Sequence, residues 1–375
     1  MMNGLLCRIY QLMIRRSMMS NWLKLAESLD SENMLGFLRS FADDCASSFF
    51  RIDPKHHPWI SQIKAVDWRS WMCVGMGGSA AGASFLSDLA GANGTTPVHV
   101  HRNYGLPSWW EPKMLVVATS YSGNTEETIH AVELALAAGG TVIVISSGGT
   151  LAGLCEIHDK AHLVLVPGGQ PPRSAFGHLF GSLMSLGWAL DLLPKPEEGK
   201  LVGMINRLRE HSLKADFTIH PDNDIAHLAF GLKERPIAVI ASMEMAGAGD
   251  RFRNQMNENA ARYARVAILP EMNHNEIVAW GDESDKDPDS EEQGLIMLAW
   301  SGMNPQVAKR MNWFTEHLLT EAAWKIDCEG ESLLEAMLHA CIDMDWLSCA
   351  LGLLNDKDPS SIGPIIQLKE HLSNS

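Results

Sequence analysis

The 375-residue chain is 46% hydrophobic and 20% charged, a composition typical of a folded protein long enough for two domains. Its formal net charge of −15 disfavours nucleic acid or an anionic membrane as its main partner. An anionic ligand must therefore be bound by local groups, namely backbone amides, hydroxyls and a few arginines.

The seven cysteines are scattered and none forms a CxxC pair. This pattern predicts a reducing, cytoplasmic location and neither a disulfide framework nor a zinc site. No run of 18 or more apolar residues is present, so we expect no membrane span. Arg8, Arg15 and Arg16 interrupt the apolar N-terminal stretch, which is not the pattern of a signal peptide, and either Met18 or Met19 is an alternative start.

The first seventy residues are predicted to be helices and connectors. Met34, Leu35, Leu38 and Phe41 recur at helical spacing, and Asp30–Ser31 is a suitable cap before them.

Beyond residue 70 the pattern changes to short apolar runs separated by segments of helical length. Strands are expected at Met72–Gly75, Pro97–Val100, Met114–Thr119, Thr141–Ser146 and His162–Val166. Helices are expected between them, at Ala80–Leu89 and Thr125–Ala138. This alternation predicts a parallel sheet covered by helices on both faces.

A long helix at Ser174–Leu193 is expected to close this unit, and a similar second unit follows. Its expected strands are Ile237–Ser242, Val266–Leu269 and Leu295–Ala299. Its expected helices are Arg251–Ala264, Pro305–Ala323, Ser332–Leu354 and Ile362–Leu372. The predicted fold class is α/β, with two tandem parallel-sheet sandwich subdomains and flanking helices. We expect a helical segment at 1–70, subdomains at 71–200 and 201–375, and a solvated acidic loop at 282–292.

Two loops that follow neighbouring predicted strands are suited to binding an anion. Gly75–Ser79 (GMGGS) lets the backbone approach a ligand closely and adds one hydroxyl. Ser120–Thr125 (SYSGNT) offers three aliphatic hydroxyls and free amides at a helix start. Ligands of doubly wound sheets bind beyond the carboxyl ends of the strands, where such groups favour phosphate.

Both loops have alternative interpretations. Ser122, Asn124 and Thr125 are equally suited to capping the following helix. The first loop also fits the GxGxxA pattern of dinucleotide-binding proteins, but the next strand ends at His101–Arg102 rather than at an acid, which disfavours NAD although not NADP. Two serine-bearing loops on neighbouring strands favour a small phosphorylated ligand.

Polar residues suited to acid–base chemistry lie in the second unit. Arg251, Gln255, Glu258 and Arg262 form one stripe on a helix. On periodicity alone, a solvated face with a Glu258–Arg262 ion pair is the favoured interpretation. His274, in Asn-His-Asn-Glu (273–276), can likewise belong to a capping box.

Aldose–ketose isomerisation of a sugar requires these same residue types. A base moves a proton between C1 and C2, a second group opens the pyranose ring, and a cation or donor stabilises the developing oxyanion. Glu258, His274 and Arg173 match these three requirements.

The motifs in combination resemble a known family. Gly75–Ser79 with SYSGNTEET (Ser120–Thr128) looks like the sugar isomerase (SIS) domain. Four further motifs make the chain similar to the bifunctional phosphoglucose/phosphomannose isomerases from about Cys73 to Leu372: GGQPPR (168–173), NENA (257–260), PEMNHNEI (270–277) and DPSSIGPIIQLKEHL (358–372).

This resemblance implies two SIS-type subdomains and a homodimer that acts on glucose 6-phosphate and often mannose 6-phosphate, with no metal or other cofactor. It implies that five residues of the two loops bind the substrate phosphate: Gly78, Ser79, Ser120, Ser122 and Thr125.

The resemblance also implies four catalytic residues. Glu258 would transfer the C1/C2 proton through a cis-enediol(ate), and Arg173 would stabilise that intermediate. His274, contributed by the neighbouring subunit, would open the ring, and Lys369 would approach the sugar.

Three positions depart from the family pattern. Pro171–Pro172 stand where one proline is expected, Ala261 stands where a lysine is expected, and only Ser360 and Ser361 are near the position of an expected threonine. These departures favour glucose 6-phosphate over mannose 6-phosphate as the substrate.

The main alternative function is a non-catalytic SIS protein that senses a sugar phosphate. Such regulators carry a basic helix-turn-helix, which the N-terminal region does not show. An NADP oxidoreductase and an amidotransferase-type SIS synthase are weaker alternatives.

Overall fold

The computed structural model describes residues 21–373 except 282–286, 288, 318–319 and 321. The alternative starts at Met18 and Met19, and much of the acidic loop, lie outside the described residues. The described part of that loop contains a short 3-10 helix, η4 (Ser290–Glu292), in which the two glutamates are exposed and Ser290 is buried.

The first sheet has five parallel strands in the order β2-β1-β3-β4-β5. All five expected strands are confirmed within two residues: β1 (Ser70–Val74), β2 (Val98–His101), β3 (Met114–Thr119), β4 (Val142–Ser146) and β5 (Ala161–Leu165). Every residue of β1, β3 and β4 is buried, as expected for strands whose two faces are both covered.

Alternate residues of each strand enter two different cores. Leu115 and Val117 of β3 pack with α5 (Gly77–Asn93) and α8 (Phe176–Ala189). The intervening side chains of β3 pack on the other face with α6 (Glu126–Ala137) and α7 (Gly149–Ile157). A short helix, α4 (Ile60–Lys64), precedes β1.

The second sheet has four parallel strands in the order β7-β6-β8-β9. They are β6 (Ile237–Ser242), β7 (Ala264–Leu269), β8 (Gly294–Ala299) and β9 (Ala323–Asp327). Its outer face packs on α12 (Pro305–His317) through Met311 and Phe314. Two parallel sheets within one chain confirm the predicted α/β class.

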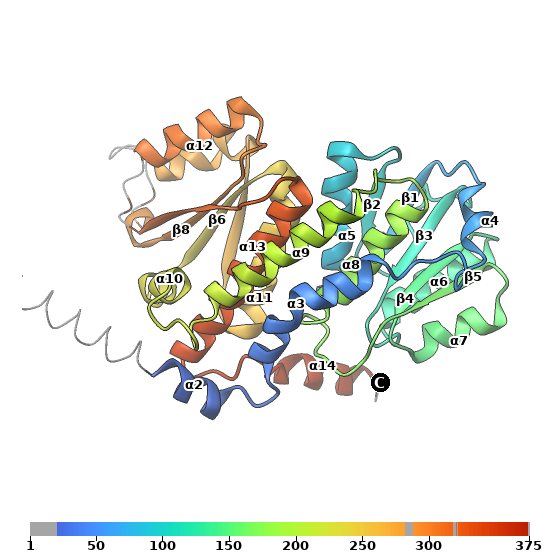
Figure 1. Ribbon diagram of the computed structural model, residues 1–375, viewed down its shortest axis with the longest axis horizontal. Helices are drawn as coiled ribbons and strands as arrows, with labels where there is room; N and C mark the ends of the chain where they lie inside the picture. The colour runs from blue at the N-terminus through green and yellow to red at the C-terminus, as the bar shows by residue number, and fades with distance from the viewer. Residues whose placement is uncertain (1–20, 282–286, 288, 318–319, 321, 374–375) are drawn as a thin grey trace, which may run out of the picture.

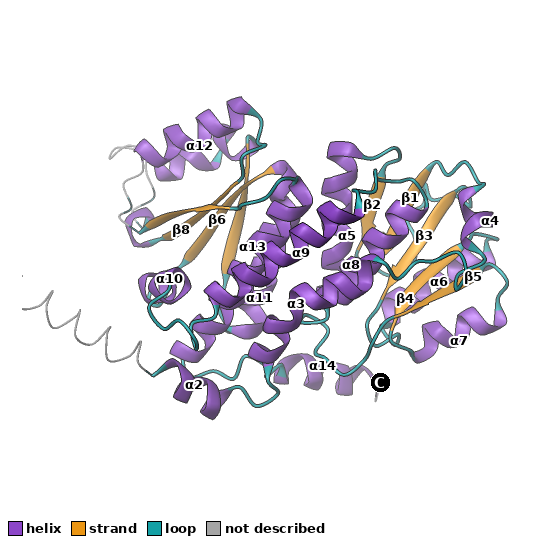
Figure 2. Ribbon diagram, in the orientation of Figure 1, coloured by secondary structure: helices purple, strands orange, loops and turns teal. Residues whose placement is uncertain are grey.

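A layer of helices lies between the two sheets (Figure 1). Besides α5 and α8, it contains α3 (Met34–Phe49), α9 (Glu198–Ala215), α11 (Ala246–Asn259) and α13 (Leu333–Leu354), with α10 (Asp224–Leu232) beside α13. One continuous hydrophobic core runs through this layer and reaches both sheets. Figure 2 shows the same arrangement, with strands on either side of the central helices.

Helix α13 is buried along its whole length. Among the described residues it is the one helix long and apolar enough to cross a membrane, and its burial is that of the central helix of a folded core.

The remaining helices lie at the ends of the chain or beside loops. The Asp30 carboxylate accepts hydrogen bonds from the amides of Met34 (2.6 Å) and Leu35 (2.9 Å), so the expected cap before α3 is confirmed. The other elements are α2 (Trp22–Leu29), α14 (Gly363–Ser373), and the 3-10 helices η1 (Met243–Met245), η2 (Glu271–His274) and η3 (Glu276–Trp280).

Two expected helices of the second unit are corrected. The helix expected at Arg251–Ala264 is α11, which begins at Ala246 and ends at Asn259, and Ala261 beyond it adopts the left-handed conformation (φ 50°) that often terminates helices. The helix expected to continue through Ala323 ends at His317, and Ala323 begins β9.

Candidate active site

The loop between β1 and α5 packs closely against the segment that carries Arg173. A Cβ atom at Gly78 would lie 3.0 Å from Arg173 Cα, so a larger residue would push this backbone away by a few tenths of an ångström. Gly77 has φ 54°, a left-handed conformation that glycine adopts without strain. The buried Ser79 hydroxyl accepts a hydrogen bond from the Tyr121 amide (3.1 Å), which ties this loop to the next one.

The second loop joins β3 to α6 at the carboxyl end of the neighbouring strand. The hydroxyls of Ser120 and Thr125 are hydrogen-bonded to each other across it (2.9 Å). Thr125 occupies the N-cap position of α6, yet its side chain makes no capping hydrogen bond. The exposed Ser122 hydroxyl accepts a hydrogen bond from the Asn124 amide (3.3 Å) and also caps no helix end. Asn124 Oδ1 accepts the Thr150 amide (2.9 Å) in the first turn of α7. Capping of α6 by any of the three residues is therefore not supported, and the amides at its start remain available to an anion.

The polar stripe of α11 is buried, so its interpretation as a solvated face was wrong. Arg251 is 4% exposed and Gln255 is 2% exposed. Both side chains donate to the buried Asp345 carboxylate of α13, Gln255 at 2.9 Å and Arg251 through two nitrogens. Arg262 lies beyond the end of α11 and donates to backbone carbonyls rather than to Glu258.

Arg251 also contacts the segment that carries Arg173. Its guanidinium lies 4.4 Å from the centre of the Phe176 ring, and one of its nitrogens donates to the Arg173 carbonyl at 3.4 Å. Burial opposes the charge of Arg251, but the Asp345 carboxylate outweighs burial and raises the pKa of the guanidinium. The Arg251 guanidinium therefore stays charged inside the central helix layer.

The Arg173 guanidinium has a hydrogen-bond acceptor at each of its three nitrogens. Nε donates to Asn259 Oδ1 (2.7 Å), Nη1 lies 3.4 Å from Glu258 Oε2, and Nη2 donates to the Pro359 carbonyl. Asn259 is itself fixed by donating to the Ser348 hydroxyl (2.9 Å). Arg173 is 3% exposed, so these contacts hold a buried cation in one orientation.

Glu258 is the partly exposed member of this network, with 24% of its side chain accessible. Burial raises the pKa of Glu258 above its ordinary value of 4.5, and the charges of Arg173 and Arg251 only partly offset this effect. A carboxylate of this kind, fixed beside a cation and reachable from solvent, is suited to accept and return a proton near neutral pH.

A cavity of about 650 Å³ lies between the segment that ends at Arg173 and the loop that leads into α14. Its lining includes Gln170 and Arg173 from one segment, and Ser360 and Ser361 from the loop before α14. The Ser360 hydroxyl is buried and has no hydrogen-bond partner among the described residues. The two serines noted near the expected threonine position therefore line a cavity beside the buried arginine.

His274 and Lys369 are not brought to Glu258 by any contact within the described chain. His274 is exposed on η2, beyond the end of β7, and its segment forms no capping box because Asn275 rather than Asn273 accepts the Glu276 amide. Lys369 is exposed on α14. The loops, Arg173 and Glu258 are thus assembled within one chain, whereas these two residues are not.

Three residues of the site were not anticipated from the sequence. Asn259 and Ser348 orient Arg173, and Asp345 balances Arg251. Asn259 lies within the NENA motif, which was a usable signal. The two residues of α13 lie 89 and 94 positions from their partners, so no local pattern could identify them.

The two sheets and the hydroxyl-bearing loops define the class of the protein. Residues 66–160 match the SIS domain. The solved structure of tagatose-6-phosphate ketose/aldose isomerase from Escherichia coli has the same fold, with a TM-score of 0.68 at 13% identity over 87% of this chain and 95% of that chain. The protein is an SIS-domain protein with two parallel sheets.

The second half of the chain identifies the family. Residues 221–372 match the bacterial phospho-glucose isomerase C-terminal SIS domain. Two proteins named bifunctional phosphoglucose/phosphomannose isomerase are similar over most of their length. The one from Caldicellulosiruptor bescii is 31% identical (83% of this chain, 91% of that protein), and the one from Aquifex aeolicus is 30% identical (80% and 88%). The chain belongs to the bifunctional phosphoglucose/phosphomannose isomerase family, as the motifs predicted.

Proposed function

We propose that this protein is an aldose–ketose isomerase that interconverts glucose 6-phosphate, and mannose 6-phosphate as a second substrate, with fructose 6-phosphate. The observation that carries the proposal is the contact of Glu258 with Arg173, whose backbone packs on the first hydroxyl-bearing loop. This contact joins a proton-transfer group, a cation and an anion-binding loop in one place.

The substrate phosphate is proposed to bind at Gly78, Ser79, Ser120, Ser122 and Thr125. The loops that carry these residues follow adjacent parallel strands and lead into α5 and α6, whose N-terminal amides favour a negative charge. The net charge of −15 makes such local donors necessary, because the protein as a whole repels an anion.

Glu258 is proposed to remove the proton from C2 of the open-chain aldose and to return it to C1, while a hydroxyl proton passes from O2 to O1, so that the reaction is balanced without an external oxidant. In the reverse direction it removes the C1 proton of the ketose. The negative charge that develops on the enediolate oxygens would be stabilised by Arg173, which three acceptors hold in place before the substrate binds. No cofactor is required by this scheme.

The site is proposed to be completed in a cytoplasmic homodimer. His274 of a second subunit would open the sugar ring, and Lys369 would approach the sugar. Both side chains are exposed in the single chain. Four apolar side chains of α14 are also 40–57% exposed, which supports a further contact at this helix: Ile365, Ile366, Leu368 and Leu372. We also propose that the chain is divided into a helical segment (1–70) and two subdomains (71–200 and 201–375).

A direct test measures conversion of fructose 6-phosphate to both aldoses by metal-chelated protein. We expect Glu258→Gln to abolish turnover while substrate binding, measured by calorimetry, is retained. The matched control is Glu234→Gln, at a glutamate whose side chain is 86% exposed, and it should turn over normally. Normal turnover by Glu258→Gln would refute the assignment. Sugar-phosphate binding without turnover by the wild-type protein would instead favour a sensor.

Subunit mixing tests the shared site. Glu258→Gln and His274→Ala are each expected to be inactive alone. When refolded together as a random mixture, about half of the dimers contain one of each chain and one intact site, so about a quarter of wild-type activity should return. No recovery in verified mixed dimers would contradict a site formed from two chains.

A further inference from the structure

A cluster of two histidines and one aspartate lies between α9 and α13, apart from the candidate active site. His211 Nε2 lies 2.7 Å from one oxygen of Asp343, and His339 Nδ1 lies 3.4 Å from the other. The three potential ligand atoms lie within 4.8 Å of one another. None of these residues contacts Arg173 or Glu258 in the described chain.

The local sequence explains how this cluster forms. His339 and Asp343 are one helical turn apart on α13 and therefore face the same side. His211 reaches them from α9, and its ring is stacked on that of His339 with the ring centres 3.5 Å apart. Asp343 and His339 are buried, whereas His211 keeps 22% of its side chain exposed.

A simple ion pair does not satisfy every polar atom of this cluster. The buried His339 Nδ1 has no hydrogen-bond partner among the described residues, because its 3.4 Å contact with Asp343 lacks the direction of a hydrogen bond. A buried carboxylate with an unsatisfied ring nitrogen beside it is the donor set that a cation completes.

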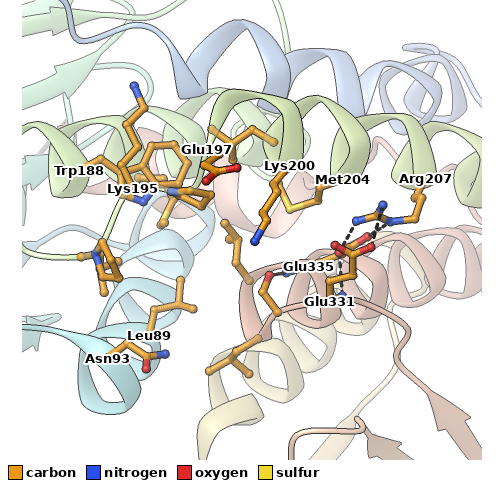
Figure 3. A pocket seen from close by; sticks show the side chains of 18 residues that line it. Leu89, Asn93, Trp188, Lys195, Glu197, Lys200, Met204, Arg207, Glu331 and Glu335 are labelled. Atoms are coloured by element: carbon orange, nitrogen blue, oxygen red, sulfur yellow. Dashed lines mark hydrogen bonds and ion pairs between the residues drawn. The ribbon is translucent and has the colours of Figure 1, made fainter.

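A cavity of about 300 Å³ gives access to this cluster. Its lining includes both histidines, two cationic side chains (Arg207 and Lys214) and four glutamates: Glu210, Glu329, Glu331 and Glu335. Glu335 lies one turn before His339 but is already bound to Arg207 through two hydrogen bonds of 2.6 and 2.9 Å. Figure 3 shows this pair and Glu331 at the edge of a larger neighbouring cavity of about 480 Å³. The four glutamates outnumber the two cationic side chains of the lining, which favours a cation there, and the contact with Arg207 keeps Glu335 out of the ligand set.

We propose that His211, His339 and Asp343 bind one divalent transition-metal ion, such as Zn²⁺, with water from the cavity completing its coordination. Two imidazoles and one carboxylate with an open position form a donor set that zinc accepts. Ligand atoms around a tetrahedral zinc lie about 3.3 Å apart, so the stacked rings must turn slightly toward a common point. His211, which is partly exposed, has the room to do so.

The bound ion would join α9 to α13. The same helix α13 carries Asp345 and Ser348, which hold Arg251 and, through Asn259, Arg173. The proposed site therefore stabilises the helix on which the candidate active site is built, without taking part in its chemistry. This makes the inference independent of the proposed function.

Cobalt titration of chelator-treated protein tests the proposal. We expect one Co²⁺ per chain with visible d–d absorption, displacement by Zn²⁺, and a rise in thermal midpoint on metal addition. Thiolate-to-metal absorption should be absent, because the three proposed ligands include no cysteine. The thermal and optical readouts do not depend on isomerase activity.

Matched variants decide the outcome. His211→Ala, at the partly exposed ligand, should lose both the absorption and the thermal shift while keeping the wild-type circular dichroism spectrum, and Asp343→Asn provides a second variant of unchanged size. His220→Ala removes an exposed histidine outside the cluster and should bind cobalt as the wild type does. Absence of saturable binding, or binding that persists in a folded His211→Ala variant, would overturn the proposal.

Discussion

Replacing Asp345 by asparagine is expected to be one of the most destabilising single changes in the central helix layer. The substitution keeps the side chain's size but removes the charge that balances Arg251, whose guanidinium is 4% exposed. Breaking a buried ion pair by removing one partner typically costs about 3–5 kcal/mol, because the remaining charge is left unpaired. That is a large fraction of the roughly 5–15 kcal/mol by which a folded protein is stable.

Urea unfolding followed by circular dichroism measures this effect through the shift of the transition midpoint. The matched control is Asp43→Asn, which breaks the exposed Asp43–Arg209 pair and should cost less than about 1 kcal/mol. Isomerase activity should fall together with stability in Asp345→Asn, since Arg251 also donates to the Arg173 carbonyl. Equal and small losses in the two variants would refute the claim that Asp345 balances a buried cation.

Three further predictions concern the loops, the base and a buried acid. Ser122→Ala combined with Thr125→Ala should raise KM for phosphorylated sugars in steady-state assays, and an unchanged KM would remove the proposed phosphate role. Because the pKa of Glu258 is raised above 4.5, kcat/KM should begin to fall on acidification while the pH is still above 4.5. A fall that begins only at or below pH 4.5 would count against Glu258 as the base. The Asp88 carboxylate accepts a hydrogen bond from the Gly247 amide. Burial raises the pKa of Asp88 to about 7, from 3.8 in the unfolded chain. The folded state therefore binds more protons, so stability should decline between about pH 4 and 7 by at most about 1.4 kcal/mol per unit, and Asp88→Asn should abolish that part of the slope.

The strands of the fold were largely predictable from the sequence. Buried parallel strands are continuous apolar runs, so β3 and β6 were predicted with their observed bounds. Strand β9 was missed because its residues alternate between intermediate and exposed positions and include charged side chains, as at a sheet edge. The start of α11 was misplaced because AGAG (246–249) has weak helical propensity and is helical through its packing on α5.

The candidate site was predictable where its residues form local motifs. The two loops, Arg173 and Glu258 were singled out, and the structure brings Arg173 into contact with Glu258 and with Gly78. The buried state of Arg251 was not predictable, because its partner lies on a helix 94 residues away and helical periodicity alone indicates only a polar stripe. The roles of His274 and Lys369 depend on a second subunit and stay predictions.

Hydrogen exchange at the sugar carbon tests the central claim most directly. Wild-type protein incubated with fructose 6-phosphate in D₂O should incorporate deuterium at C2 of the aldose product, because the carboxylate of Glu258 exchanges its proton with solvent during transfer. Glu258→Gln should bind the sugar phosphate and show neither isomerisation nor deuterium incorporation above the uncatalysed rate. Incorporation by that variant at the wild-type rate would contradict the account.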